Sequence, residues 1–199
     1  MVITDWRLPR ERLLWALERA LEAGPEVAVQ HRHPDAPVRQ FLEEARVLAG
    51  LCRARGNPFF VNGRLDVALL VGAHLHLPAG GLTPGEVRPH LPRGRLVSVA
   101  VHDGREASDA RGADLALVSP VFPPGSKPDD TRPTLGPEGF QRLASLLPCP
   151  ALALGGITPE RAPLLPGASG FAVISGILEA GDPTAATLSL IDPAGRSGR

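Results

Sequence analysis

The sequence lacks any excess of one charge, and this absence narrows the range of partners. Its 199 residues hold 21 lysines and arginines against 21 aspartates and glutamates, so the formal net charge is zero. A neutral chain offers no general attraction for nucleic acid or for an anionic membrane. No apolar run approaches the ~20 residues of a membrane helix, and charged residues appear too early for a signal peptide. We therefore expect a cytoplasmic protein with no nucleic-acid or membrane partner.

Cysteine and lysine are scarce as well. Cys52 and Cys149 lie far apart and show no CxxC or Cys/His spacing, which argues against a zinc site or a disulfide scaffold. Lys127 is the only lysine of the chain, and it follows Ser126 in a proline-rich segment, residues 119–135. A long loop in a compact domain often has a function. We therefore predict that Ser126 and Lys127 close over an anionic group of a ligand.

Short apolar segments alternate with longer amphipathic ones along the whole chain. The short segments are rich in Val, Leu and Ala, as expected for strands that are buried on both faces of a parallel sheet. They cover residues 2–4, 26–30, 59–61, 74–77, 96–101, 115–118, 151–154 and 171–174. Helical patterns fall between them, for example at residues 9–23 and 38–55, and sequences such as Thr158-Pro-Glu are typical of helix starts.

Eight such alternations predict a (β/α)8 TIM barrel of minimal length, with one long loop after the sixth strand. The barrel would form a single domain over residues 1–193, followed by a frayed tail at residues 194–199. An open doubly wound sheet is the alternative architecture, because the same alternation of strands and helices is compatible with both.

In a parallel barrel, functional groups lie at the carboxyl ends of the strands. Gly155 and Gly156 follow the seventh predicted strand, and Ile174, Ser175 and Gly176 follow or end the eighth. Glycine turns that open helices present free N–H groups, which bind phosphate. We therefore predict a phosphate site here, although glycine also serves simply to permit a sharp turn.

Histidines at other strand ends are candidates for proton transfer, because imidazole is a natural general base near neutral pH. His102 and His76 end or follow the fifth and fourth strands and are the preferred candidates. A structural role for His102, as a cap of the next helix, is the alternative. His31 and His33 are weaker candidates, and a metal cluster built from these histidines is a further alternative.

Several motifs together resemble the family of thiamin phosphate synthases and their TenI-like relatives. The motifs are SPVFPPGSKP at 119–128, LGPEGF at 135–140, ALALGGITPE at 151–160 and AVISGIL at 172–178. The resemblance implies a (β/α)8 barrel, a homodimer and a small phosphorylated heterocycle as ligand. It also implies ligand binding by Arg32, Asn62, Ser126, Lys127, Gly156, Ile174 and Ser175.

The two branches of this family differ in chemistry. The synthases join a pyrimidine pyrophosphate to a thiazole phosphate with magnesium, but Gly63 and residues 78–81 stand where magnesium-binding aspartates are expected, and Pro34 replaces a lysine. The TenI-like branch lacks those aspartates too, and its Leu-Pro-Ser-Gly resembles residues 77–80. Pro120 stands at the position of that branch's catalytic histidine.

From these matches we expect a thiazole tautomerase that transfers a proton on a thiazole phosphate and needs no metal or cofactor. A thiamin phosphate synthase is the first alternative, and only this alternative would require magnesium. A non-catalytic protein that binds thiazole phosphate or thiamin phosphate is the second. A phosphate-binding barrel outside the family is the third.

Overall fold

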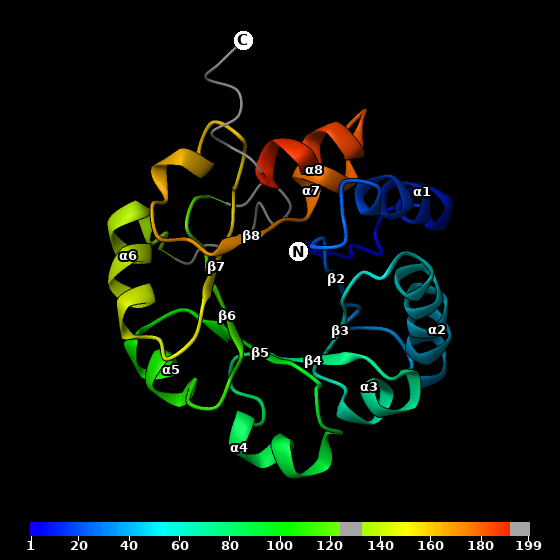
Figure 1. Cartoon of the computed structure of the whole chain (residues 1–199), viewed down its shortest axis with the longest axis horizontal. Coiled ribbons are helices and arrows are strands. Elements are labelled where there is room, and N and C mark those ends of the chain that lie inside the picture. The colour runs from blue at the N-terminus through cyan, green and yellow to red at the C-terminus, as the bar shows by residue number, and fades with distance from the viewer. Residues whose placement is uncertain (124–132, 192–199) are drawn as a thin grey trace.

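The computed structural model describes residues 1–123 and 133–191. The predicted lid residues Ser126 and Lys127 lie outside the described residues, as does the predicted tail at 194–199. Eight parallel strands form one sheet in sequential order (Figure 1). They are β1 Val2–Ile3, β2 Val29–His31, β3 Phe59–Asn62, β4 His74–Leu77, β5 Val97–Val101, β6 Leu115–Val118, β7 Ala151–Leu154 and β8 Gly170–Ala172.

The sheet curls into a barrel whose first and last strands meet. Val2 pairs with Val173 in an isolated parallel bridge, and the Ile3 N–H donates to the Val173 carbonyl at 2.9 Å. This contact confirms the predicted (β/α)8 barrel and shows that the open doubly wound alternative is wrong. The predicted strand at 26–30 was placed too early, because β2 begins only at Val29.

Helices surround the ring of strands (Figure 1). The α-helices are α1 Arg10–Leu21, α2 Val38–Arg55, α3 Leu65–Val71, α4 Pro84–Val87, α5 Gly104–Asp109, α6 Gly136–Leu146, α7 Ser175–Leu178 and α8 Pro183–Ile191, and two 3-10 turns are η1 Arg88–His90 and η2 Ala162–Leu164. On α1, Leu13, Leu17 and Leu21 recur every four residues and are all buried, so this face packs inward as the periodicity predicts.

The connection after β7 departs from the expected pattern. Thr158-Pro-Glu does not begin an α-helix; the chain instead forms turns and the short η2. Pro163 and Pro166 lie too close together for a helix to pass through them, because each removes a backbone donor and clashes with the preceding turn. The turn that follows β7 therefore does not lead into a helix, whereas the turn that follows β8 leads into α7.

The interior of the barrel carries few large apolar side chains toward its carboxyl end. A small apolar cluster of Ile3, Leu117 and Ala172 lies inside the ring of strands and is separate from the main core. The register aligns Asn62 with His76, and His76 with Ser98, across three neighbouring strands. Polar side chains therefore fill the barrel at the level where parallel barrels place their active sites.

Candidate active site at the carboxyl end of the barrel

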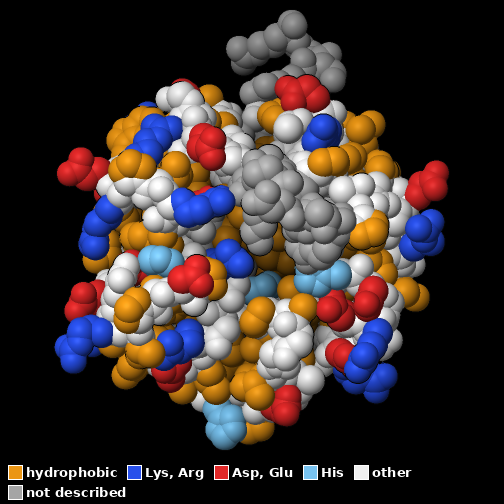
Figure 2. Space-filling model, turned by 180° about the vertical axis from the view of Figure 1, so that it is seen from behind, with side chains coloured by type: hydrophobic (Ala, Val, Ile, Leu, Met, Phe, Trp, Pro, Cys, Tyr) orange, Lys and Arg blue, Asp and Glu red, His pale blue; other side chains and the backbone are white. Residues whose placement is uncertain are grey.

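A cavity of about 330 Å³ opens at this end of the barrel, a size suited to a small ligand. It brings together most of the side chains and turns that the sequence predicted as a site. These are Arg32, Asn62, His76, His102, Gly155, Gly156, Ile174, Ser175 and Gly176. Figure 2 views the barrel from the side opposite to Figure 1 and shows histidine side chains around the hollow at the centre of this face.

The β7 side of the cavity is a turn of two glycines in left-handed conformations. Gly155 and Gly156 have φ angles of +103° and +58°. A Cβ atom on Gly156 would lie 2.5 Å from the Pro123 carbonyl oxygen, and one on Gly155 would lie 3.0 Å from Pro120 Cα. Both glycines are therefore required for the turn to pack against the chain that follows β6. The Arg161 guanidinium also donates to the Gly156 carbonyl at 2.8 Å.

The same turns expose backbone donors. Within the described residues, no backbone hydrogen bond uses the N–H groups of Gly156, Ser175 or Gly176. Ser175 and Gly176 form the first residues of α7 and also line the cavity. Free N–H groups at the start of a helix favour an anion, so this side of the cavity offers donors that suit a phosphate group.

Arg32 lies two strands away from β8 around the barrel, just after β2, and its backbone is fixed. Thr4 Oγ1 accepts a hydrogen bond from the Arg32 N–H at 2.9 Å and donates one to the Arg32 carbonyl at 3.1 Å. Among the described residues, no carboxylate forms an ion pair with the Arg32 guanidinium, whereas Arg7 pairs with Asp5. Arg32 also lines a neighbouring cavity of about 240 Å³.

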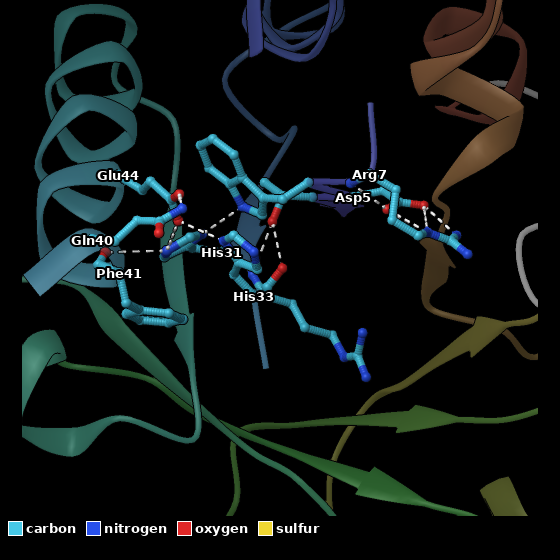
Figure 3. A network of polar contacts seen from close by, with 10 residues as sticks. Asp5, Arg7, His31, His33, Gln40, Phe41 and Glu44 are labelled. Atoms are coloured by element: carbon cyan, nitrogen blue, oxygen red, sulfur yellow. Dashed lines mark hydrogen bonds and ion pairs between the residues drawn. The ribbon is translucent and has the colours of Figure 1, made fainter. Parts of the chain in front are cut away.

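His31 is buried beside Arg32 and serves the structure of this loop (Figure 3). The Trp6 indole donates to His31 Nδ1 at 3.2 Å, so Nδ1 must be the acceptor nitrogen. Nε2 lies 3.2 Å from the Phe41 carbonyl and donates to it. Both ring nitrogens are therefore engaged by a neutral imidazole, and burial lowers the pKa of His31 to about 4.

His33 joins the same network from the other face of Trp6. Its ring stacks on the Trp6 indole with 5.5 Å between centroids and 7° between planes. His33 Nδ1 lies 2.9 Å from the buried Glu44 carboxylate, which also accepts from Gln40 at 2.9 Å. These contacts link the loops that follow β1 and β2 to α2 (Figure 3). Within the described residues no group of histidines and carboxylates could hold a metal, so the predicted histidine metal cluster does not form there.

His76 lies inside the barrel wall, 4% exposed, with Nδ1 2.9 Å from Ser98 Oγ. Burial lowers its pKa to about 3, and the nearby charges of Arg32 and His102 act in the same direction. A neutral imidazole of such low basicity is a poor proton acceptor but a good hydrogen-bonding partner. His76 is therefore better placed to orient a ligand than to remove a proton, and its catalytic role stays a prediction.

His102 lies at the rim and is oriented by a residue that the sequence did not single out. Glu106 Oε2 lies 2.7 Å from His102 Nδ1 and accepts the His102 backbone N–H at 2.7 Å. Because Nδ1 is engaged, Nε2 is the nitrogen left for a ligand in the cavity. The signal for Glu106 was its position four residues after a strand-end histidine, at the start of a helix.

Two further lining residues were missed by sequence reasoning. Gln30 is buried on β2, and its side-chain carbonyl accepts from Asn62 Nδ2 at 3.2 Å. Ser119 follows β6 and lines the cavity beside Pro120. A buried amide within an apolar strand was the available signal for Gln30, since a buried polar group generally needs a partner.

Magnesium, which the resemblance implies for a synthase, prefers carboxylate oxygens. No aspartate or glutamate is among the described residues that line the cavity. The nearest carboxylates are already engaged: Asp5 accepts from Arg7, Glu106 pairs with His102, and Asp103 accepts the Glu106 N–H. The described residues therefore do not fit a resident magnesium ion.

A second, larger cavity of about 630 Å³ lies at the other end of the barrel. Apolar side chains such as Val27, Phe60 and Leu152 dominate its lining, and its described residues gather no comparable set of cations and free N–H groups. Despite its size, its chemistry is less suited to a phosphorylated ligand than that of the cavity at the carboxyl ends.

The fold and the site together define a (β/α)8 barrel with a small cavity at the carboxyl ends of its strands, lined among the described residues by one guanidinium, two imidazoles and free backbone N–H groups. The thiamine monophosphate synthase (TMP-TENI) family model matches residues 1–177, and the chain belongs to this family. Thiamine-phosphate synthase of Methanoculleus marisnigri is 37% identical over 196 residues, which cover 96% of this chain and 92% of that protein. The enzyme of the same name from Chloroflexus aurantiacus is 37% identical over 194 residues, with 95% and 89% covered.

Solved structures agree with this assignment. Thiamine phosphate pyrophosphorylase from Pyrococcus furiosus superimposes with a TM-score of 0.81 at 32% identity and covers 100% of this chain and 96% of that chain. A 3-hexulose-6-phosphate synthase gives a TM-score of 0.71 at 17% identity, with 96% and 98% covered, and shows the fold alone.

The expectation of a thiazole tautomerase is wrong. Relatives that match nearly the whole chain are named thiamine-phosphate synthase, and none of the relatives given above is named a tautomerase. Single substitutions such as Gly63 suggested the TenI-like branch, whereas the similarity of the entire sequence favours the synthases.

In the described part of the chain, no helix is long and apolar enough to cross a membrane.

Proposed function

We propose that this protein is a thiamine-phosphate synthase, which joins a pyrimidine pyrophosphate to a thiazole phosphate and releases pyrophosphate. One observation carries the proposal: a single cavity holds two groups of donors suited to anions, backbone N–H groups after β7 and β8 and side chains after β2 and β5, in a chain similar to named synthases over almost its full length. Two phosphorylated substrates require two such groups, and the product retains one phosphate.

Each side of the cavity has a part in this proposal. The N–H groups of Gly156, Ser175 and Gly176 would hold the monophosphate of the thiazole, because backbone donors favour a compact anion. Arg32 and His102 would hold the pyrophosphate on the other side. Arg32 offers a planar fork that matches phosphate oxygens. His102, when its ring carries both protons, offers an Nε2–H donor while Nδ1–H stays bound to Glu106.

Polar groups between these two sides would orient the heterocycles. Asn62, His76 and Ser119 line the cavity, and His76 is held by Ser98 at 2.9 Å. Apolar contacts come from Leu117, Leu154 and Ile157. A cavity that combines apolar surface with a few fixed polar groups is typical of a site for a small ring compound.

The direct test is a synthase assay with both substrates, in which thiamin phosphate is detected by chromatography and pyrophosphate release is measured separately. We expect both products in equal amounts. A chain that binds thiazole phosphate but forms no thiamin phosphate under any metal condition would contradict the proposal.

A second candidate is a non-catalytic protein that binds thiazole phosphate or thiamin phosphate. The observation in its favour is the absence of carboxylates from the described cavity lining. The synthase branch that the sequence resembles uses magnesium, which carboxylates would hold. Tight binding of thiamin phosphate, with no turnover of the two substrates, would favour this candidate over the synthase.

A further inference from the structure

We propose that this chain binds the diphosphate group of its substrate through its own cation and hydrogen-bond donors, with no resident divalent cation. The inference rests on the proposed function, because that function requires a diphosphate ester in this cavity. It differs from the synthase branch that the sequence resembles, in which aspartates hold magnesium at this place.

The first support is the chemistry of the lining. A resident divalent cation needs several oxygen ligands, usually including carboxylates. The described lining holds amides, imidazoles, one guanidinium and backbone groups, but no carboxylate. Glu106 lies near the rim, yet its Oε2 atom is engaged by both the ring and the backbone N–H of His102.

The second support is an arginine kept available for an anion. Several arginines of this chain have carboxylate partners, for example Arg64 with Asp66 and Arg88 with Asp114. Within the described residues Arg32 forms no ion pair: its charge helps to lower the pKa of Asp5, but that carboxylate pairs with Arg7. Arg32 lines the cavity, and its backbone is held by Thr4. A positioned guanidinium can form two parallel hydrogen bonds to phosphate oxygens, which supplies positive charge where a metal would otherwise be needed.

The third support is the space beside β3. Gly63 has a φ angle of +70°, and a Cβ atom built on it would meet only Pro78 ring carbons at 3.7 Å. Position 63 therefore has room for a short side chain and follows Asn62, which lines the cavity, but the sequence has glycine there. Aspartate and asparagine tolerate positive φ better than other residues, so a carboxylate can be restored and its effect measured.

The test is calorimetric titration of inorganic pyrophosphate into the full-length protein, with EDTA in one series and magnesium in the other. We expect dissociation constants in the two series to agree within about threefold, whereas Arg32→Gln should weaken binding about tenfold or more in both. Arg64→Gln is the matched control, because it also removes one guanidinium near the same strand ends but outside the cavity, and we expect it to bind like the parent.

The restored carboxylate provides a second measurement. We expect Gly63→Asp to weaken pyrophosphate binding in EDTA and to recover it with magnesium, because the new carboxylate repels the free anion and attracts the cation. Gly63→Asn has the same shape without the charge and should show no magnesium dependence. Equal behaviour of the two variants would count against the inference.

The outcomes separate this inference from the proposed function. Pyrophosphate binding by the parent protein only in the presence of magnesium would overturn the inference, even if thiamin phosphate forms. Metal-independent binding that depends on Arg32 would support it. A complete lack of thiamin phosphate formation would overturn the synthase proposal and leave the binding result standing.

Discussion

The two sides of the cavity offer different kinds of donors to an anion. The side formed by β7 and β8 presents backbone N–H groups at Gly156, Ser175 and Gly176. The side formed by β2 to β5 presents side chains, including Arg32 and His102. The backbone side depends on chain geometry and carries no titratable group among its donors, whereas the other side depends on charge, tautomer and hydrogen-bond partners.

This difference determines which changes each side tolerates. A backbone site is damaged by any side chain that alters the turn, regardless of its charge. A side-chain site can keep its shape after substitution but lose its charge or its pH dependence. Three sets of variants and conditions would show whether the two sides behave in this way.

The largest effect is expected from Gly156→Ala on the backbone side. Its Cβ would lie 2.5 Å from the Pro123 oxygen and 2.9 Å from Phe122 Cβ, and the residue has positive φ. We expect the free energy of unfolding to fall by roughly 1–3 kcal/mol and binding of thiazole phosphate to weaken about tenfold or more. Urea unfolding and calorimetry measure the two effects.

Gly80→Ala is the control for this prediction, on the other side of the cavity. Gly80 has a φ angle of +71°, but no described atom beyond its chain neighbours lies within 4 Å of the position that its Cβ would occupy. It shares the backbone strain and lacks the clash, so its loss of stability should be closer to the roughly 1 kcal/mol of a glycine at positive φ. Equal losses of binding in both variants would mean that the clash at the β7 turn does not matter.

The second prediction concerns pH, which should act on stability through buried histidines. Burial lowers the pKa of His31 to about 4 and that of His76 to about 3, whereas unfolded histidine titrates near 6.5. Below about pH 6.5 the unfolded chain binds protons that the folded chain does not. The free energy of unfolding should therefore fall as pH decreases from about 6.5 toward 4, by up to about 1.4 kcal/mol per pH unit for each histidine.

Urea denaturation at a series of pH values measures this slope. Replacement of His76 by glutamine removes one of the buried titrating groups and keeps a hydrogen-bonding side chain, so the slope below about pH 6.5 should decrease. An unchanged slope in this variant would show that His76 is not buried as a neutral imidazole.

The smallest effect is expected from Glu106→Gln at the rim. Glutamine can still accept the two hydrogen bonds from His102, but it removes the negative charge that strengthens them. We expect pyrophosphate binding to weaken about two- to fivefold, while the free energy of unfolding changes by less than about 1 kcal/mol. Calorimetry and urea unfolding measure the two effects. A loss of stability with unchanged binding would indicate a structural role only.

The fold was largely predictable because eight short apolar segments alternate with amphipathic ones, and this periodicity depends only on local sequence. The α-helix expected after β7 does not form, because Pro163 and Pro166 override the start signal at Thr158. The predicted cavity residues outside 124–132 come together because they share one feature, a position at a strand's carboxyl end.

Glu106 and Gln30 were missed because their roles depend on contacts across elements rather than on a motif. Gln30 meets Asn62 only through the pairing of β2 with β3. The expected tautomerase failed for a different reason: Gly63 and residues 77–80 suggested a branch of the family that the similarity of the whole chain does not support.

The packing of Trp6 gives this protein an optical property. The sequence contains two tryptophans and no tyrosine, so its near-ultraviolet fluorescence comes almost entirely from two indoles. Trp15 is 39% exposed on α1, beneath the Arg12 guanidinium, whereas Trp6 is half-buried and packs against His31 and His33 beside the loop of Arg32. After Trp15→Phe, the emission spectrum would report on this loop alone, so that ligand occupancy could be followed in real time without any attached dye.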